Sequence, residues 1–106
     1  MTTAYLRFGT ASASSGRKAF GSLDVGEGGK GVRIPVCVVH GAQPGRHIVI
    51  IANQHGTELN GIESVRRFCG AVDPRRVRGT VFAVISANPR AAASGQPVWT
   101  EDDPKA

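Results

Sequence analysis

The sequence has few aromatic residues and no excess of apolar ones. Aromatic side chains make up 6% of the 106 residues, so we expect a core built mainly from Val, Ile and Ala. Apolar residues reach 41% and charged residues 20%, close to the values of globular proteins. This composition excludes a disordered or fibrous chain, and the length leaves room for one domain at most.

Cysteine, long apolar segments and leader-like features are also scarce. Cys37 and Cys69 lie in apolar stretches without CxxC spacing, which predicts buried thiols in a reducing compartment and excludes a disulfide framework. The apolar run at residues 47–52 is far shorter than the ~20 residues of a membrane-spanning helix. The N-terminus lacks the pattern of a signal peptide. We therefore expect a cytoplasmic protein with no membrane partner.

Acidic residues are outnumbered, with 13 Lys and Arg against 8 Asp and Glu and a net charge of +5. A basic chain raises the question of a nucleic-acid partner. However, the basic residues are scattered along the sequence, and they are dense only at residues 75–78. No aromatic residues alternate with them, as they do on stacking surfaces. We therefore expect a solvated basic surface and no nucleic acid, and we keep a nucleic-acid binder only as the weakest alternative.

The first half of the chain shows weak strand signals separated by turns. Residues 1–16 are rich in Ser, Ala, Thr and Gly and predict a loose lead-in. Residues 17–25 alternate weakly and predict a strand, and the glycine-rich 26–31 predicts a hairpin connection because it lacks the phosphate-loop patterns. Residues 32–40 predict a second strand, which Pro35 favours at a sheet edge.

The second half predicts a strand, a helix and a strand. Residues 46–53 form a β-branched run without polar alternation, typical of a strand covered on both faces. Apolar residues then follow helical spacing from Leu59 to Cys69, with Gly70 as the expected end of the helix. Residues 80–86 predict another buried strand, which completes a βαβ unit with parallel strands. The chain beyond Asn88-Pro89 is expected to be irregular.

His55 and Glu58 lie where the predicted buried strand gives way to the helix. Ligand sites of open α/β sheets form at this carboxyl edge. An imidazole and a carboxylate three residues apart can converge on one point, and both are zinc ligands; Gly56 would permit the tight turn between them. The alternative is a loop histidine bonded to backbone and a glutamate opposing the positive helix end. His40 and His47 have no neighbours in sequence that suggest a site.

The stretch from residue 34 to 88 resembles the succinylglutamate desuccinylase/aspartoacylase family, a branch of the zinc-carboxypeptidase-like hydrolases. The matching segments are IPVCVVHGAQPGRHIVIIANQHGTELNGIESVRRF, the Asp73-Pro74 and Gly79-Thr80 connection, and TVFAVISANPRA. The segment HGTELNG carries the HGxE signature of that family. The resemblance implies an α/β fold, the N-terminal part of a zinc-carboxypeptidase-like mixed sheet with a βαβ unit.

The resemblance also implies a function. His55 and Glu58 would be the first two zinc ligands of a zinc-dependent hydrolase that deacylates N-acyl amino acids or related small carboxylates. A catalytic zinc needs three protein ligands and an open position. No histidine follows His55, and no later carboxylate fits the catalytic Glu of the family. The tail at residues 100–106 resembles the acidic segment before the Asn-Arg substrate clamp.

These observations predict a three-part organisation. Residues 1–16 form the lead-in, 17–90 the N-terminal part of the catalytic domain, and 91–106 a polar tail that stops before the clamp. We expect the isolated chain to be inactive. The alternative is a non-catalytic metal- or partner-binding module of the same fold, which could self-associate through exposed sheet edges.

Overall fold

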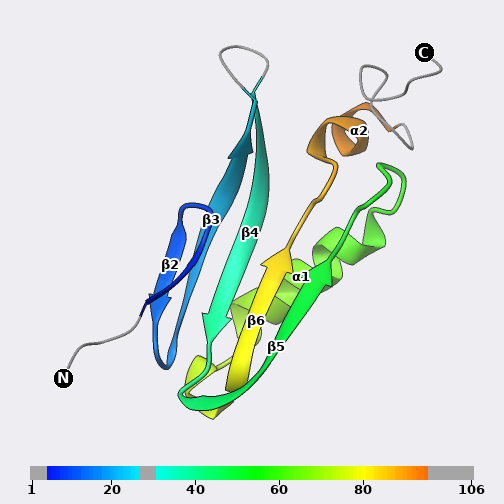
Figure 1. Cartoon of the computed structure of the whole chain (residues 1–106). Helices are drawn as coiled ribbons and strands as arrows, with labels where there is room; N and C mark the ends of the chain where they lie inside the picture. The colour runs from blue at the N-terminus through cyan, green and yellow to red at the C-terminus, as the bar shows by residue number, and fades with distance from the viewer. Residues whose placement is uncertain (1–4, 27–30, 96–106) are drawn as a thin grey trace.

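The described part of the chain is an α/β structure with one four-stranded sheet, a short hairpin and two helices (Figure 1). The computed structural model describes residues 5–26 and 31–95. The elements are β1 (Tyr5–Phe8), β2 (Ala11–Ser14), β3 (Arg17–Val25), β4 (Val32–His40), β5 (Gln43–Ile51), α1 (Asn60–Ala71), the 3-10 turn η2 (Pro74–Arg76), β6 (Arg78–Val84) and α2 (Pro89–Ser94).

The sheet is mixed, with the strand order β3-β4-β6-β5. β4 pairs antiparallel with β3 on one side and with β6 on the other. β5 and β6 pair parallel with each other, and α1 connects them along the chain. This confirms the predicted α/β class and the βαβ unit. The predicted hairpin connection between β3 and β4 falls at residues 27–30, which lie outside the described residues, but the two strands pair from Arg17↔His40 to Val25↔Val32.

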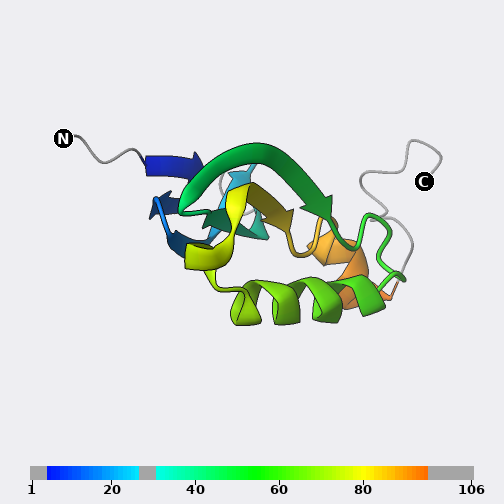
Figure 2. The same cartoon turned by 90° about the horizontal axis from the view of Figure 1, so that it is seen from below.

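Each face of the sheet carries its own core because successive strand residues point to opposite faces. On one face Cys37, Val39 and Ala83 pack with Val65 and Cys69 of α1. Figure 2 shows this helix lying along that face. On the other face the core consists of Val36, Val38 and Val84 with Ala11 and Ala13 of β2.

The expected loose lead-in at residues 1–16 contains ordered structure. β1 and β2 form an antiparallel hairpin with Tyr5 opposite Ser14. Ala11 and Ala13 are buried against the sheet, because side chains this small allow the hairpin to approach closely. The Ser- and Ala-rich composition that suggested a loose segment is thus the composition of a close-packed strand.

The prediction that β4 lies at a sheet edge is wrong, because β4 lies between β3 and β6. Pro35 is tolerated there for a local reason. The β4–β6 pairing begins at Val36↔Val84, so Pro35 lies at the end of that ladder. Its carbonyl still accepts a hydrogen bond from the Ile85 N–H at 2.8 Å. The proline therefore removes a donor only at the last position, where the ladder ends.

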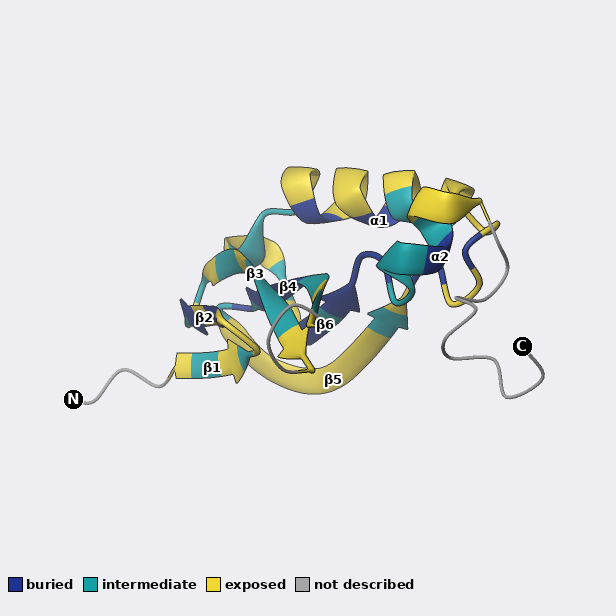
Figure 3. Ribbon diagram, turned by 90° about the horizontal axis from the view of Figure 1, so that it is seen from above, coloured by how far each residue is buried: buried dark blue, intermediate teal, exposed yellow. Residues whose placement is uncertain are grey.

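The prediction that residues 46–53 form a strand covered on both faces is also wrong. β5 is an edge strand, and it begins at Gln43, three residues before the predicted start of the strand at residue 46. Ile48, Val49 and Ile51 are 54–62% exposed, and Figure 3 shows β5 as an exposed strand along the outside of the sheet. The β-branched run correctly indicated a strand, but its burial depends on whether another part of the chain packs against it, which the run itself does not encode.

The helix α1 continues past Gly70 to Ala71 and its C-cap is Val72, so the C-cap predicted at Gly70 is two residues early. No basic residue of the helix lies in its last turn. Instead Lys18 of β3 donates hydrogen bonds from Nζ to the carbonyls of Gly70 and Val72, at 2.8 and 3.0 Å. The cation at the negative helix end comes from a distant strand.

The chain after β6 forms a second helix where an irregular tail was expected. Asn88 caps α2, its Oδ1 accepting from the Ala91 N–H, and Pro89 occupies the first turn, where its missing N–H costs nothing. Neither helix of the described part has the length and apolar content that a membrane span requires. Of the polar tail expected at residues 91–106, residues 91–94 belong to α2 and residues 96–106 lie outside the described residues.

Candidate metal centre

The predicted site residues lie in the loop between β5 and α1, at the carboxyl end of the parallel pair β5 and β6. His55 and Glu58 precede the helix, which begins at Asn60, so the pair is held by a turn and not by a helical turn. The Glu58 N–H donates to the His55 carbonyl at 3.0 Å, which closes that turn. The loop therefore aims both side chains to the same side.

The side chain of Asn53 holds the backbone of this loop in place through hydrogen bonds. It is 3% exposed and has a positive φ of 59°, the left-handed region that Asn tolerates better than most residues. Its Nδ2 donates to the carbonyls of His55 and Glu58, at 2.8 and 3.3 Å. Its Oδ1 accepts from the buried hydroxyl of Ser86 at 2.8 Å. One side chain thus fixes the backbone under both predicted ligands and ties it to the end of β6.

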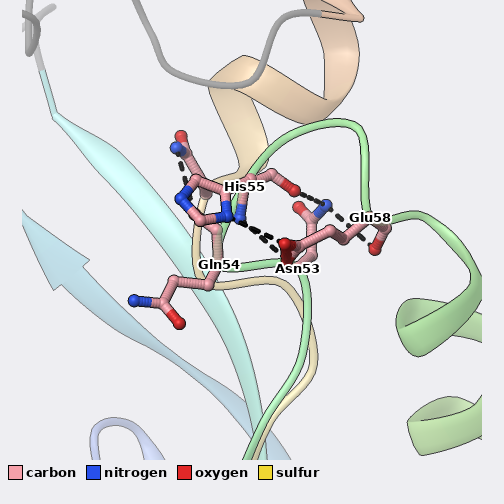
Figure 4. Close-up of polar contacts among 5 residues, drawn as sticks. Asn53, Gln54, His55 and Glu58 are labelled. Atoms are coloured by element: carbon pink, nitrogen blue, oxygen red, sulfur yellow. Dashed lines mark hydrogen bonds and ion pairs between the residues drawn. The ribbon is translucent and has the colours of Figure 1, made fainter.

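The side chains of His55 and Glu58 point toward each other (Figure 4). His55 Nδ1 and Glu58 Oε1 are 2.8 Å apart, and the His55 backbone N–H donates to Glu58 Oε2 at 3.3 Å. Both side chains are about half exposed. The convergence predicted from their spacing is present, and Gly56 is a central residue of the turn that the Glu58 N–H closes onto the His55 carbonyl. The positive φ of this loop belongs to Asn53 and not to Gly56.

The hydrogen bonds from His55 change the acidity of Glu58. The bond from the imidazole is the main cause and the bond from the backbone N–H the second, and together they hold the pKa of the Glu58 carboxyl below its ordinary value. Glu58 is therefore a carboxylate at neutral pH. An ionised oxygen beside an imidazole nitrogen is the donor set that zinc accepts.

The spacing of the two donors fits a shared zinc ion. Two ligands at about 2.0–2.2 Å from a tetrahedral zinc lie roughly 3.3 Å from each other. The observed 2.8 Å between Nδ1 and Oε1 needs to widen by only about half an ångström, which two half-exposed side chains can supply. The metal would take the place of the proton that the imidazole shares with the carboxylate.

The pair is not a complete metal site by itself. In the part of the chain that the structure describes, no three His, Cys, Asp or Glu side chains are grouped to hold a metal. His40 and His47 lie at the other end of the sheet, both in register with Thr80. Within the described residues, the structure therefore brings together His55 and Glu58 and no third donor.

Two residues of this end had no predicted role. Asn53 and Ser86 form the buried hydrogen-bonded pair beneath the loop. The available signal for Asn53 was an Asn directly after a β-branched run, since Asn is one of the few residues that adopt a positive φ at low cost. Ser86 gave no signal, because its role depends on β6 lying beside the end of β5.

Comparison with known families gives one clear match. Residues 44–102, which are more than half of the chain, match the family model of the succinylglutamate desuccinylase/aspartoacylase catalytic domain. The segment includes β5, the His55–Glu58 loop, α1, β6 and α2. No curated protein matches the sequence significantly.

Solved structures of similar fold come from several bacteria. An aspartoacylase family protein from Mesorhizobium loti superposes with a TM-score of 0.71 at 24% identity, over 80% of this chain and 27% of its own. The product-bound ectoine utilization protein EutE (DoeB) from Ruegeria pomeroyi gives 0.72 at 20% identity, over 80% and 27%. A succinylglutamate desuccinylase/aspartoacylase from Rhodobacter sphaeroides gives 0.68 at 21% identity, over 74% and 25%.

These structures share the fold of the chain, which spans about a quarter of their length. The elements that match include the strand, turn and helix around His55 and Glu58. The chain belongs to the succinylglutamate desuccinylase/aspartoacylase catalytic domain family.

Proposed function

We propose that this chain is the metal-binding N-terminal part of a zinc-dependent hydrolase that deacylates N-acyl amino acids or related small carboxylates. Membership of a family of desuccinylases and aspartoacylases supports hydrolysis at the coarse level. The observation that carries the zinc proposal is the 2.8 Å approach of His55 Nδ1 to the ionised Glu58 at the carboxyl end of β5. The substrate class rests on the family alone.

His55 and Glu58 would hold the metal, and Asn53 would keep their backbone in place. When bound, zinc would polarise the scissile carbonyl and lower the pKa of a bound water toward ~7. Two protein ligands bind zinc more weakly than the three of a catalytic site. We therefore expect the 106-residue chain to bind zinc weakly and to have no hydrolase activity of its own.

Zinc titration of the purified chain by calorimetry tests the metal site. We expect binding by the native chain and at least a tenfold loss of affinity in His55→Ala, because one of two donors is removed. His47→Ala is the matched control, since it removes an exposed imidazole at the other end of the sheet. Equal zinc affinity in all three proteins would contradict the site.

An activity assay tests the expected inactivity. The chain with one equivalent of zinc is incubated with an N-succinyl and an N-acetyl amino acid, and free amine is measured. We expect no release above the zinc-only background. Robust zinc-dependent deacylation would show that two ligands are sufficient here and would overturn that expectation.

The exposed edge of β5 favours a second candidate, a module of this fold that binds a second copy of itself. Ile48, Val49 and Ile51 are exposed, and residues 47–51 carry none of the charges or prolines that usually protect an edge strand. Sedimentation measurements test this. We expect Val49→Lys to shift the chain toward monomer, whereas Val25→Lys, at an exposed position on β3, should not.

A further inference from the structure

Five arginines gather at the end of the sheet opposite the His55–Glu58 loop. We call this surface the basic end and define it as Arg17, Arg46, Arg75, Arg76 and Arg78. They come from the starts of β3 and β6, the early part of β5 and the turn η2. Figure 1 shows the starts of β3, β5 and β6 together at the lower end of the molecule.

Strand register brings these distant residues side by side. Arg17 pairs with His40 on β4, His40 pairs with Thr80 on β6, and Thr80 pairs with His47 on β5. Arg46 directly precedes His47, within the irregular stretch of β5 between Gln43 and His47, so it lies next to this row but is not one of the paired residues. The four strands themselves form one row. Three strand spacings of ~4.8 Å make this row about 14 Å wide, close to the rise of four base pairs of a duplex.

Backbone hydrogen bonds hold the turns of this end together. The Gly16 N–H donates to the His40 carbonyl at 2.8 Å, and the Ala42 N–H donates to the Pro74 carbonyl at 3.1 Å. These bonds join the β2–β3 turn and the β4–β5 turn to the strand end and to η2. The arginines therefore project from a fixed scaffold, which reduces the entropy lost on binding a ligand.

Most of these cations have no acidic partner. Within the described residues, Arg17, Arg46, Arg76 and Arg78 form no ion pair and are exposed. Arg75 binds Asp73, with Nε 3.1 Å from Oδ1. The other described acids lie elsewhere and have their own partners, namely Asp24 with Arg33, Glu58 with His55, and Glu63 with Arg66 and Arg67.

Lys18 differs from these four arginines because the fold already uses it. Its ammonium group donates to the last carbonyls of α1, which also end at this side of the sheet. The ammonium group of Lys18 thus neutralises the negative C-terminal end of α1. Arg17, Arg46 and Arg78 have no such structural task, and Arg76 only helps to lower the pKa of the Asp73 carboxyl, which Arg75 already binds. The charge of these four arginines is therefore available to an external anion.

A cleft of about 640 Å³ lies beside them, lined by Ser15, Gly16, Arg17, Lys18, Ala42, Asp73, Pro74 and Arg75. No aromatic side chain lines this cleft, and its apolar lining is limited to small groups. Single-stranded nucleic acid is bound through aromatic stacking, and protein interfaces are anchored by large apolar or aromatic side chains. The cleft offers neither and favours a ligand recognised by charge.

We propose that the basic end binds the phosphate backbone of double-stranded nucleic acid, without reading its sequence. Planar guanidinium groups bind phosphate oxygens in pairs, and several cations on one rigid surface fit a ligand with regularly repeated phosphates. This reverses the expectation drawn from the scattered basic residues of the sequence. The proposal does not depend on the zinc site, which lies at the other end of β5.

Fluorescence anisotropy of a labelled 20-base-pair duplex with the full chain tests the proposal, between 50 and 200 mM salt. Neutralising about four phosphates gives a log–log salt slope near −3.6, which corresponds to a roughly 150-fold loss of affinity over this range. The double variant Arg76→Gln/Arg78→Gln should lower the slope to about −1.8 and weaken binding at least ~tenfold at 100 mM salt.

The matched control is Arg66→Gln/Arg67→Gln, which removes the same net charge from α1, where both arginines pair with Glu63. This variant should bind the duplex within about twofold of the native chain. Circular dichroism verifies that both variants are folded. Absence of duplex binding at 50 mM salt, an equal loss in the control, or equally tight binding of poly-glutamate would each overturn the proposal.

Discussion

At the carboxyl end of β5 and β6 the polar side chains are hydrogen-bonded to one another, whereas at the amino end of the same strands Arg17, Arg46 and Arg78 are exposed and form no ion pair among the described residues. At the first end Asn53, Ser86, His55 and Glu58 form one hydrogen-bonded set. At the second end backbone hydrogen bonds join the turns, and Lys18 and Arg75 have partners of their own, but no ion pair holds Arg17, Arg46 or Arg78.

This difference separates two ways of building a functional surface. A small hard ligand such as a metal ion needs donors within about 2 Å of one point, so the supporting side chains must be locked. A large polyanion needs only charge at a suitable spacing, so a rigid backbone with long exposed side chains is sufficient. Mutations that distinguish backbone support from side-chain support should therefore affect the two ends differently.

The largest effect is expected at the amino end, from Gly79→Ala. Gly79 has a φ of 93°, and a Cβ there would lie 2.1 Å from the Arg46 carbonyl oxygen. The clash cannot be relieved without moving β5 away from β6, so we expect a loss of about 4 kcal/mol in the free energy of unfolding. Urea unfolding followed by circular dichroism measures this loss.

Gly95→Ala is the control for that experiment. Gly95 also has a positive φ, 72°, but no atom of residues 5–26 or 31–95 lies within 4 Å of the added Cβ. The variant should lose only about 1 kcal/mol, the cost of the left-handed backbone alone. Equal losses in the two variants would show that the close approach of Gly79 to β5 does not stabilise the amino end.

Asn53→Ala should have the next largest effect and should act on the carboxyl end. The substitution removes the bonds to two carbonyls and to Ser86 and leaves alanine in the left-handed region, at a cost of about 3 kcal/mol. Asn53→Gly loses the same bonds without the backbone strain and should cost about 1 kcal/mol less. The same unfolding experiment checks both variants.

Zinc affinity distinguishes the role of Asn53 from general stability. If Asn53 positions the predicted ligands, Asn53→Gly should bind zinc more weakly than the native chain even where both are fully folded. Unchanged zinc affinity in Asn53→Gly would mean that the His55–Glu58 turn holds itself.

Lys18→Met should cost less, about 1 kcal/mol, because it removes the hydrogen bonds to the end of α1 while keeping an apolar stem. Arg17→Met, the neighbouring position, should change stability by less than about 0.5 kcal/mol, since Arg17 forms no ion pair among the described residues. In duplex binding the order should reverse, with Arg17→Met weaker. The opposite order of the two variants in either assay would contradict the distinction between Lys18, which stabilises the end of α1, and Arg17, which is available to a ligand.

The core between the two ends gives the smallest effect at neutral pH. Burial is the main cause that raises the pKa of the Cys37 thiol to about 12, with the nearby Cys69 adding to it. A raised thiol pKa contributes stability that is complete below the ordinary value of 9.0 and is lost as the pH rises toward 12. Stability should thus be insensitive to this group at pH 7 and fall above pH 9.

Thiol alkylation at pH 8 checks this directly. Burial keeps the Cys37 thiol protonated and shields it from the reagent, so Cys37 should be protected in the folded chain and react freely in urea. Rapid modification of Cys37 without unfolding would contradict its burial between β4 and α1.

Local sequence signals were sufficient for the elements that depend on near neighbours. The 3.6-residue spacing around Ile62 and Val65 indicated α1, and the β-branched runs indicated β5 and β6. The convergence of His55 and Glu58 also followed from sequence, because a three-residue separation leaves few ways to place the two side chains. In each case the interacting residues are close along the chain.

Features that depend on long-range pairing could not be obtained in that way. Pro35 suggested an edge strand, but β4 is a central strand that tolerates this proline because the pairing with β6 ends beside it, at Val36↔Val84. Ile48 and Val49 suggested burial, but burial requires a neighbour that no local pattern encodes. Asn53 acquired its role because β6 brings Ser86 beside it.

The sequence by itself determined the βαβ unit, the approach of His55 to Glu58 and an excess of positive charge. Only the tertiary structure decided where that charge lies. About 30 residues of sequence separate Arg17 from Arg46 and Arg46 from Arg78. The three residues lie at one end of the sheet because β3, β5 and β6 all begin there. Strand register is set by contacts between distant segments, so a scattered set of cations along the chain can become one surface in the fold.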